Sequence, residues 1–328
     1  MSGQVVVTGG AGFIGSHVAE LLAADGDHVT IVDPSPPAQR VADRLRALGV
    51  RYHQGRVEDY HARSVAVVVH CAAPVGGLGV TQSWPVAARI VSATRAAINV
   101  AADAAAPLVN VSMSEVYGVG GAYTEATACV TPGRHSPRLG YAVGKLAAEQ
   151  DAHTANLRGV VSLRPFNVVG PRQDAGKGFV LPRFVDQALA GRSLSVFGDG
   201  LQVRAFLSVY DAAAAIRRAY HALRDAPTDL GIINVGNPAN RTTVLGLARL
   251  VIDAVEERTG TRVDVRMTNG NDEYDSAAYE EAEGLSKEPA NIDRARDLLA
   301  WEPIVDLPSL VYDAVDAALD ERRVRSAR

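Results

Sequence analysis

Short runs of branched apolar residues alternate with longer helical segments through the first half of this chain. Several runs, such as residues 65–69, are apolar at nearly every position rather than at every second one. Strands of that kind are buried on both faces, which is typical of a parallel sheet covered by helices on both sides. We therefore expect an α/β fold with a doubly wound parallel sheet. The pattern predicts strands over residues 5–8, 28–33, 50–55, 65–71, 108–112 and 159–164, and helices over 13–24, 37–48, 85–105 and 141–157.

The pattern changes after Pro165. A stretch rich in glycine and proline, residues 170–182, leads into shorter elements, which indicates a smaller C-terminal α/β domain over the open end of the sheet. We expect one domain to comprise residues 1–166 with about 205–233, and the other to comprise about 167–204 and 234–328. In this half the predicted helices are 183–190, 212–223, 244–257 and 310–319, the predicted strands are 194–197, 205–209, 232–235 and 263–267, and an acidic loop is expected at 268–288.

Composition and charge exclude several classes of protein. The 33 lysine and arginine residues against 37 aspartate and glutamate residues give a net charge of −4, which argues against nucleic acid as a partner. No apolar run reaches the roughly 18 residues of a membrane span, and the chain opens directly into a strand-like segment rather than a signal peptide. Two cysteines and scattered histidines give no disulfide framework and no metal site. We expect a cytoplasmic protein without a metal, and a frayed, solvated C-terminal tail carrying Arg322, Arg323, Arg325 and Arg328.

The strongest local motif lies between the first strand and the first helix, where residues 8–15 read TGGAGFIG. Glycines at such a turn let the backbone approach a pyrophosphate, and the following helix presents its positive N-terminal end to it. A tight structural turn is the alternative for the glycines alone. Asp33 ends the second predicted strand, where its carboxylate would bind the adenosine ribose hydroxyls and repel a 2′-phosphate. The context predicts a Rossmann-type dinucleotide site that prefers NAD to NADP.

A second motif is Tyr141 followed four residues later by Lys145 on a predicted helix, which puts both side chains on one helix face. The pair is informative because a lysine four residues after a tyrosine seldom occurs by chance in a chain with only three lysines among its 33 cationic residues. The pKa of a free tyrosine is about 10. A neighbouring ammonium and an oxidised nicotinamide ring would together lower this pKa enough for general base catalysis. The alternative is a packed tyrosine beside a lysine that extends along the helix surface.

With these motifs the chain resembles a known family, the extended short-chain dehydrogenases/reductases, and within it the NAD-dependent nucleotide-sugar epimerases, dehydratases and decarboxylases. The resemblance extends over nearly the whole chain. Its further motifs are His70-Cys71-Ala72-Ala73, SMSEVYG at 112–118, RPFNVVGPR at 164–172, Gly198-Asp199-Gly200, Arg204-Ala205-Phe206, Val209-Tyr210-Asp211 and LAWEP at 299–303.

The resemblance implies that tightly bound NAD transiently oxidises a sugar hydroxyl, usually at C4, and that epimerisation, dehydration or decarboxylation follows. It implies that Tyr141 is the base, that Lys145 anchors the nicotinamide ribose, and that Ser114 and Glu115 assist. It also implies an NAD-binding first domain, a nucleotide-sugar-binding second domain, and a homodimer formed through helices 85–105 and 141–157. The implied cofactor-binding residues are Gly9, Gly12, Phe13, Ile14, Gly15, Asp33, Asp59, Ala72, Ala73, Ser112, Tyr141, Lys145 and Pro165, and the implied substrate-binding residues are Gly76, Ser114, Glu115, Asn167 and Arg204.

Two departures from the family pattern bear on the chemistry. The position that carries a hydroxyl in the family is Met113, whose thioether cannot donate a hydrogen bond to the reacting oxygen. Ser114 is the candidate replacement, if the end of its strand twists. Glu115 is typical of the dehydratase and decarboxylase branches, although it also fits a solvated loop carboxylate or a cap. Near the C-terminus the family's Pro-x-Arg-x-Gly segment is missing, which leaves Arg204 as the foremost diphosphate-binding candidate.

Two other functions fit the same sequence. The loss of a hydroxyl at Met113 would also suit a non-catalytic NAD-binding sensor or scaffold, but the retention of Tyr141 and Lys145 argues against it. A reductase of a non-sugar ketone would instead consume NADH stoichiometrically. The sequence does not identify the sugar or its nucleotide, so UDP, GDP and dTDP donors remain open.

Overall fold

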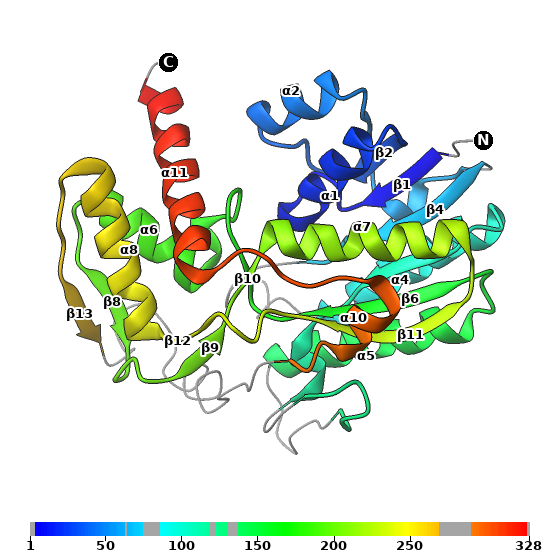
Figure 1. Cartoon of the computed structure of the whole chain (residues 1–328). Helices are drawn as coiled ribbons and strands as arrows, with labels where there is room; N and C mark the ends of the chain where they lie inside the picture. The colour runs from blue at the N-terminus through cyan, green and yellow to red at the C-terminus, as the bar shows by residue number, and fades with distance from the viewer. Residues whose placement is uncertain are drawn as a thin grey trace.

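A seven-stranded parallel sheet forms the centre of the larger of two lobes, at the right in Figure 1. The computed structural model describes residues 4–62, 64–74, 86–118, 123–129, 137–268 and 290–326. The strands lie in the order β11-β6-β5-β4-β1-β2-β3, and every neighbouring pair is parallel. Their bounds are β1 Gln4–Thr8, β2 His28–Asp33, β3 Arg51–Gln54, β4 Val65–His70, β5 Leu108–Val111, β6 Val160–Pro165 and β11 Asp229–Val235.

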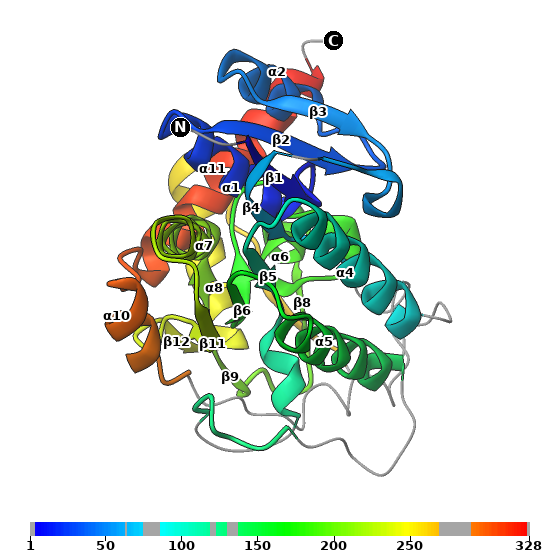
Figure 2. The same cartoon turned by 90° about the vertical axis from the view of Figure 1, so that its right-hand side faces the viewer.

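Helices cover both faces of this sheet (Figure 2). Because the sheet is covered twice, side chains are buried in both directions, and Val5, Val6 and Val7 of β1 have no exposed surface. The predicted doubly wound, Rossmann-type α/β fold is therefore confirmed. One face carries α1 (Phe13–Ala24) and α7 (Val209–Asp225) with α2 (Gln39–Ala47) beside α1, and the other carries α4 (Val86–Asp103) and α5 (Pro137–Thr154).

The chain begins in the middle of the sheet and fills it in two directions. From β1, the strands β2 and β3 follow in order toward one edge of the sheet. The strands β4, β5, β6 and β11 follow in order toward the other edge, with β4 beside β1. The helices that follow β1 and β4 therefore lie on opposite faces, and the carboxyl ends of these two strands form the position where ligands of such sheets bind. The glycine motif comes directly after β1, at this position.

A second, smaller lobe has its own hydrophobic core (Figure 1). Two short parallel strands and three helices enclose buried side chains such as Phe184, Leu247 and Val311. Two further ladders, each of two strands, connect this lobe to the large sheet. The lobe contains α6 Val180–Leu189, β8 Leu194–Phe197, α8 Val244–Thr259, β13 Val265–Thr268 and α11 Leu307–Ser326, and the ladders are β7 Val168–Val169 with β10 Leu207–Ser208 and β9 Val203–Ala205 with β12 Arg241–Thr243.

Part of the C-terminal region returns to the core of the large sheet. The helix α10 (Asp293–Leu299) packs on β11, and Trp301 is buried in the same core as the strands. The indole N–H of Trp301 donates to the carbonyl of Asp211 over 3.1 Å. The Asp211 carboxylate accepts from the backbone N–H groups of Ile304 (3.1 Å) and Val305 (3.0 Å). One buried aspartate thus fastens the segment between α10 and α11 to the start of α7.

The sequence pattern misses several short elements. The strands β7 and β12 and the helix α10 contain too few residues for a periodic signal, and the same holds for the 3₁₀ helices η1 (Val57–Asp59), η2 (Ser114–Tyr117) and η3 (Ala175–Lys177). The expected single strand at 205–209 is wrong, because Ser208 caps α7 by accepting a hydrogen bond from the Tyr210 N–H. The helix α5 begins at Pro137, four residues before its predicted start, so Tyr141 lies in its second turn.

The expectation of a frayed C-terminal tail is wrong for Arg322. The helix α11 continues to Ser326, and the Arg322 guanidinium donates to the Leu189 carbonyl (2.6 Å) and to the Asp186 carboxylate (2.8 Å) of α6. The acidic segment expected as a loop lies outside the described residues except for Thr268. None of the described helices combines the length and the hydropathy needed to cross a membrane.

Replacing Asp211 with alanine should lower the free energy of unfolding by about 1–3 kcal/mol, because two backbone N–H groups lose their acceptor. Urea unfolding followed by circular dichroism measures the change. The isosteric Asp211→Asn variant is the control: it keeps one acceptor oxygen and should lose less. Equal stability of wild type and Asp211→Ala would show that this aspartate does not hold the C-terminal segment.

Candidate active site

The glycine motif forms a tight turn from β1 into α1. Gly9 has a positive φ of 68°, and its N–H donates to the Val32 carbonyl over 2.8 Å. A Cβ at Gly15 would lie 2.3 Å from the Gly9 carbonyl oxygen, so only glycine lets α1 start this close to β1. Gly12 precedes the first turn of α1, which has no side-chain cap and no acidic residue. The backbone N–H groups at this helix end can therefore bind an anion such as a pyrophosphate.

Asp33 lies at the end of β2, beside the glycine turn. Its carboxylate accepts hydrogen bonds from the backbone N–H groups of Ala11 (3.2 Å) and Ser35 (3.0 Å). Burial raises the pKa of this carboxyl, while the two hydrogen bonds and the positive charge of Lys177 oppose the rise. The contact with Ala11 holds Asp33 next to the turn, as expected for a carboxylate that binds ribose hydroxyls.

The segment after β4 lies against the same turn. A Cβ at Gly9 would meet the Cα of Ala72 at 2.7 Å, so the two backbones touch. The Cys71 N–H also donates to the Thr8 carbonyl over 3.0 Å. Ala72 and its neighbour Ala73 are partly exposed beside the turn. That both alanines lie next to the cofactor stays a prediction, and the close approach of Ala72 to the glycine turn supports it.

His70, the last residue of β4, is a packed residue. Its side chain is fully buried, with one ring nitrogen 2.7 Å from the Thr8 hydroxyl and the other 3.0 Å from the Thr94 hydroxyl. Burial, and then the charge of Lys145, lower the pKa of His70 to about 3. A neutral imidazole with both nitrogens engaged is not positioned to exchange protons with a substrate.

Two buried hydroxyls at the end of β5 have no hydrogen-bond partner among the described residues. Ser112 and Ser114 are only 4% and 1% exposed. A buried polar group without a partner costs about 1–3 kcal/mol, so a ligand that bonds these hydroxyls would recover that energy. Ile14 of α1 and Pro165 of β6 lie close together against the core of the large sheet, and their contact with the cofactor stays a prediction. With Asp33 and the glycine turn, these features fit bound NAD.

Tyr141 and Lys145 of α5 lie at the end of β5. The Lys145 side chain is buried, and its ammonium donates to the carbonyl of Val111, the last residue of β5, over 2.8 Å. Burial lowers the pKa of Lys145 to about 8. Burial, and then the negative charge of Glu115, raise the pKa of Tyr141 above its ordinary value. In the protein alone this shift is opposite to the lowering expected from Lys145 and an oxidised nicotinamide ring.

The chain turns directly from β5 into the short helix η2. Met113 has an extended backbone with φ −165°, and its side chain packs against the core of the large sheet. Ser114 is the first residue of η2, so its hydroxyl lies at the start of the same turn that carries Glu115. That Ser114 replaces the hydroxyl missing at Met113 stays a prediction, and its buried, unpartnered hydroxyl supports it.

The other predicted site residues lie farther along the chain. Asn167 has a positive φ of 43°, and its side-chain amide donates to the Ala205 carbonyl of β9 over 2.9 Å. This bond brings Asn167 close to Arg204, the preceding residue of β9. Asp59 is exposed at the end of η1, and its contact with adenine stays a prediction. Gly76 lies outside the described residues.

The spacing of Tyr141 and Lys145 continues along α5, which the sequence analysis missed. Glu149 and His153 follow at the same interval of four residues. The Glu149 side chain is 1% exposed, and Arg164 of β6 donates to both of its oxygens, over 2.9 and 2.5 Å. We call Tyr141, Lys145, Glu149 and His153 the α5 stripe. The signal that could have revealed the last two residues is the repeated interval itself.

The fold and the site together define a class of protein. A glycine turn after β1, a carboxylate at the end of β2 and a tyrosine–lysine pair on α5 are the parts of an NAD-dependent short-chain dehydrogenase/reductase. The chain belongs to the NAD dependent epimerase/dehydratase family, whose family model matches residues 5–236. The predicted family, its enzymatic nature and its use of NAD are therefore confirmed.

Several known proteins are similar over most of the chain. UDP-glucuronic acid decarboxylase 4 of Arabidopsis thaliana is 30% identical over 323 residues, which cover 94% of this chain and 68% of that protein. UDP-N-acetyl-alpha-D-glucosaminuronate decarboxylase of Bacillus cytotoxicus is 32% identical over 250 residues, 72% of this chain and 76% of its own. The structure of UDP-N-acetylglucosamine 4-epimerase from Methanobrevibacter ruminantium, in complex with UDP-N-acetylmuramic acid, has a TM-score of 0.81 at 25% identity and covers 98% of this chain and 99% of its own.

Replacing Gly15 with alanine should weaken NAD binding by at least about tenfold, because the new Cβ would push α1 away from the turn that receives the pyrophosphate. Isothermal titration calorimetry with NAD measures the loss. Gly26→Asn is the matched control: Gly26 follows the other end of α1, a Cβ there would meet nothing within 4 Å, and asparagine tolerates its positive φ. Unchanged affinity in Gly15→Ala would remove the glycine turn from the cofactor site.

Proposed function

We propose that this protein decarboxylates a UDP-linked hexuronic acid, by a reaction that begins with oxidation of the sugar hydroxyl at C4. Two observations support the proposal: the charge of Glu115 acts on the Tyr141 phenol, so these side chains lie near one another, and the preceding residue, Ser114, has a buried hydroxyl without a partner among the described residues. The relatives from A. thaliana and B. cytotoxicus are named as decarboxylases of UDP-linked uronic acids, which supports this substrate class.

Tyr141 removes the proton from the C4 hydroxyl. Because burial and Glu115 raise the pKa of its phenol, the phenolate requires positive charge nearby. Lys145 contributes an ammonium, which the Val111 carbonyl holds at the end of β5. When bound, oxidised NAD supplies a two-electron acceptor and one further positive charge. The protein's own contribution is to position the phenol and the ammonium on one helix face, one turn apart.

Ser114 and Glu115 act on the oxidised sugar. A ketone at C4 stands β to the carboxylate, so the bond between C5 and the carboxylate carbon breaks, CO2 leaves, and the electron pair moves onto the ketone oxygen. The Ser114 hydroxyl donates a hydrogen bond to that oxygen, the role for which Met113 has no donor. Glu115 relays a proton from water to C5, and Tyr141 returns its proton to the oxygen when the C4 ketone is reduced, so the reaction consumes one proton and no net NAD.

The second lobe holds the nucleotide end of the substrate in this proposal. We assign residues 1–166 with about 205–233 to NAD binding, and about 167–204 with 234–328 to nucleotide-sugar binding. Asn167 and Arg204 lie where the two parts meet, and Arg204 provides a positive charge for the diphosphate. Binding energy from the nucleotide, remote from C4, would hold the sugar against Tyr141.

We also propose that two copies pair through α4 and α5. The two helices lie side by side on one flank of the molecule (Figure 2), and Val143 of α5 is 44% exposed. The two helices approach so closely that a Cβ at Gly144 would lie only 2.8 Å from the Cα of Ala87.

We further propose a location in the cytoplasm. The two cysteines, Cys71 and Cys129, are free thiols, which supports a reducing compartment such as the cytoplasm.

Purified protein incubated with UDP-glucuronic acid and NAD should release CO2 and form a UDP-pentose, without accumulation of NADH. Mass spectrometry and proton NMR in deuterated water identify the product. Tyr141→Phe should reduce kcat by about 10²–10⁴-fold, because the general base is removed while the ring still packs. A panel of UDP-glucose, UDP-N-acetylglucosamine, UDP-N-acetylglucosaminuronic acid, GDP-mannose and dTDP-glucose provides the comparison.

Three results would contradict this function. An isomeric product that keeps its carboxylate would make the protein an epimerase, and net formation of NAD from NADH on a non-sugar ketone would make it a reductase. Binding of NAD without turnover of any donor would favour the sensor function. The Glu115→Gln variant tests the step assigned to Glu115: oxidation of the bound sugar, seen as transient absorbance of NADH, should continue, while protonation at C5, and with it formation of the UDP-pentose, should slow.

Val143→Arg should convert a dimer into a monomer, because it places an unpaired charge on the exposed side of α5. Sedimentation velocity measures the oligomeric state. Leu298→Arg changes another exposed apolar residue, 42% exposed on α10, and should leave the dimer intact. A monomeric wild type, or a dimer that survives Val143→Arg, would exclude this interface.

A further inference from the structure

The buried ion pair between Glu149 and Arg164 lies one helical turn beyond Lys145. Both side chains are almost fully buried, 1% and 5% exposed, and the carboxylate receives two hydrogen bonds from the guanidinium. A buried ion pair is rarely a net source of stability, because the two charges lose their hydration. Its presence at this position therefore calls for an explanation other than stability.

The pair connects the three elements that carry the candidate active site. Glu149 belongs to α5, together with Tyr141 and Lys145, and Arg164 belongs to β6, next to Pro165. The Arg164 guanidinium also lies over the ring of Tyr117, 4.6 Å from its centre. Tyr117 is the last residue of η2, the helix that begins with Ser114, and its hydroxyl donates to the Asn234 side chain of β11 over 2.7 Å.

The pair also contributes negative charge near Lys145, through Glu149. On its own helix the ammonium has Glu149 one turn later and Tyr141 one turn earlier, and the end of β4 presents His70 and Cys71. From β5 it receives only the Val111 carbonyl among the described contacts. Against the lowering caused by burial, first Cys71, when it is ionised, and then Glu149 raise the pKa of Lys145. Burial raises the pKa of the Cys71 thiol to about 12, so Glu149, the one carboxylate among these groups, carries the negative charge near neutral pH.

We propose that Glu149 and Arg164 are positioning residues of the active site: the carboxylate keeps Lys145 an ammonium, and the guanidinium holds that carboxylate and fixes α5 against β6 and η2. The pair acts through Lys145 and touches no reacting atom. This inference rests on the proposed function, in which Lys145 must be charged to favour the Tyr141 phenolate.

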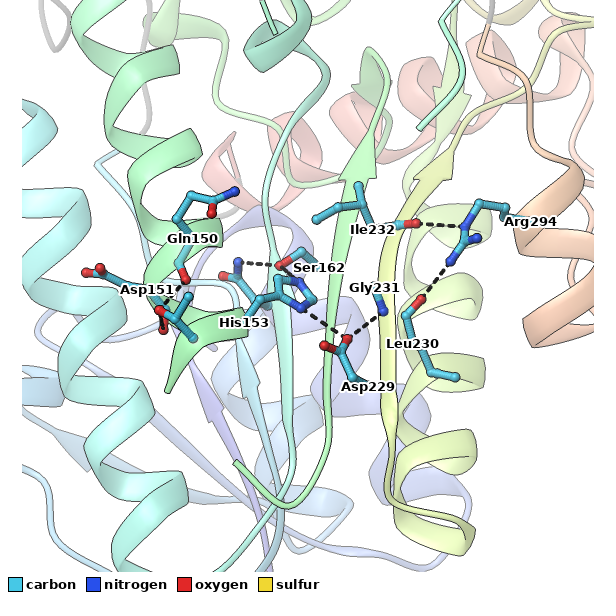
Figure 3. A network of polar contacts seen from close by, with 11 residues as sticks. Gln150, Asp151, His153, Ser162, Asp229, Leu230, Gly231, Ile232 and Arg294 are labelled. Atoms are coloured by element: carbon cyan, nitrogen blue, oxygen red, sulfur yellow. Dashed lines mark hydrogen bonds and ion pairs between the residues drawn. The ribbon is translucent and has the colours of Figure 1, made fainter. Parts of the chain in front are cut away.

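A second anchor at the end of the α5 stripe provides a matched control. Figure 3 shows His153 between Ser162 of β6 and Asp229 of β11, with its ring nitrogens 3.1 Å from the oxygen of each. Ser162 is fully buried and its hydroxyl accepts a hydrogen bond from Asn110, so this serine–histidine–aspartate arrangement has no accessible nucleophile. His153 therefore ties the end of α5 to the sheet two turns beyond Lys145.

The test uses the small number of lysines in the chain. Lysine labelled with carbon-13 at Cε gives three NMR signals, from Lys145, Lys177 and Lys287, and Lys177→Arg and Lys287→Arg variants assign them. The pKa of Lys145 in the wild type should be about 8. Glu149→Gln should lower it by roughly one unit. His153→Asn should leave it unchanged.

Glu149→Gln leaves Arg164 buried and unpaired, so this variant can fail to fold. The double variant Glu149→Met with Arg164→Met replaces the pair by apolar side chains of similar size and keeps the core filled. It removes the carboxylate together with the guanidinium, whose charge opposes that of the carboxylate at Lys145, so the pKa of Lys145 should still fall, but by less than in Glu149→Gln. A purely structural pair would leave that pKa at its wild-type value. An unchanged pKa in the folded double variant overturns the proposal.

The pH dependence of the reaction gives an independent readout. Lys145 is charged below its pKa, so activity that depends on the ammonium declines as the pH rises through that value. In the double variant the lower pKa of Lys145 should move the alkaline decline in activity to lower pH, by the same number of pH units as the pKa falls. The single variant Glu149→Asp keeps a carboxylate, so its alkaline decline should lie closer to that of the wild type. If the wild type turns over no donor, the proposed function fails, while the Lys145 titration still decides the role of the pair.

Discussion

The close approach of three backbone segments around one glycine turn is the constraint on which the site depends. No side chain fits between Gly9 and Ala72, or between Gly15 and the Gly9 carbonyl. The end of β1, the start of α1 and the segment after β4 therefore meet at one place, where the helix presents uncapped N–H groups. Asp33 reaches this place from β2 through the Ala11 N–H.

The sequence predicts this region well because each feature there is local or periodic. Unbroken apolar runs indicate buried parallel strands, and a glycine-rich turn between a strand and a helix indicates a dinucleotide site, so the large sheet and its ligand-binding edge follow. The four-residue interval of Tyr141 and Lys145 likewise identifies the helix face that carries the chemistry. These inferences need no knowledge of distant contacts.

Other features depend on contacts between residues far apart in the sequence. The pairing of Glu149 with Arg164 joins a helix to a strand, and neither residue alone distinguishes a buried partner from a surface charge. The rise in the Tyr141 pKa comes from burial and from Glu115, which only the tertiary structure brings near the phenol. Short elements such as β7 and β12 form because neighbouring strands complete their hydrogen bonds, so their sequences carry no periodicity.

The return of the C-terminal segment to the large sheet has a consequence for how the protein is made. Trp301 and Ile292 belong to the same core as Val5 and Val7, although almost the whole chain separates them. The core of the first lobe therefore stays incomplete on the ribosome until residues 292–301 have emerged, and α11 completes the second lobe only after that. Synthesis cannot release one finished domain before the other, so the two lobes reach their native packing together.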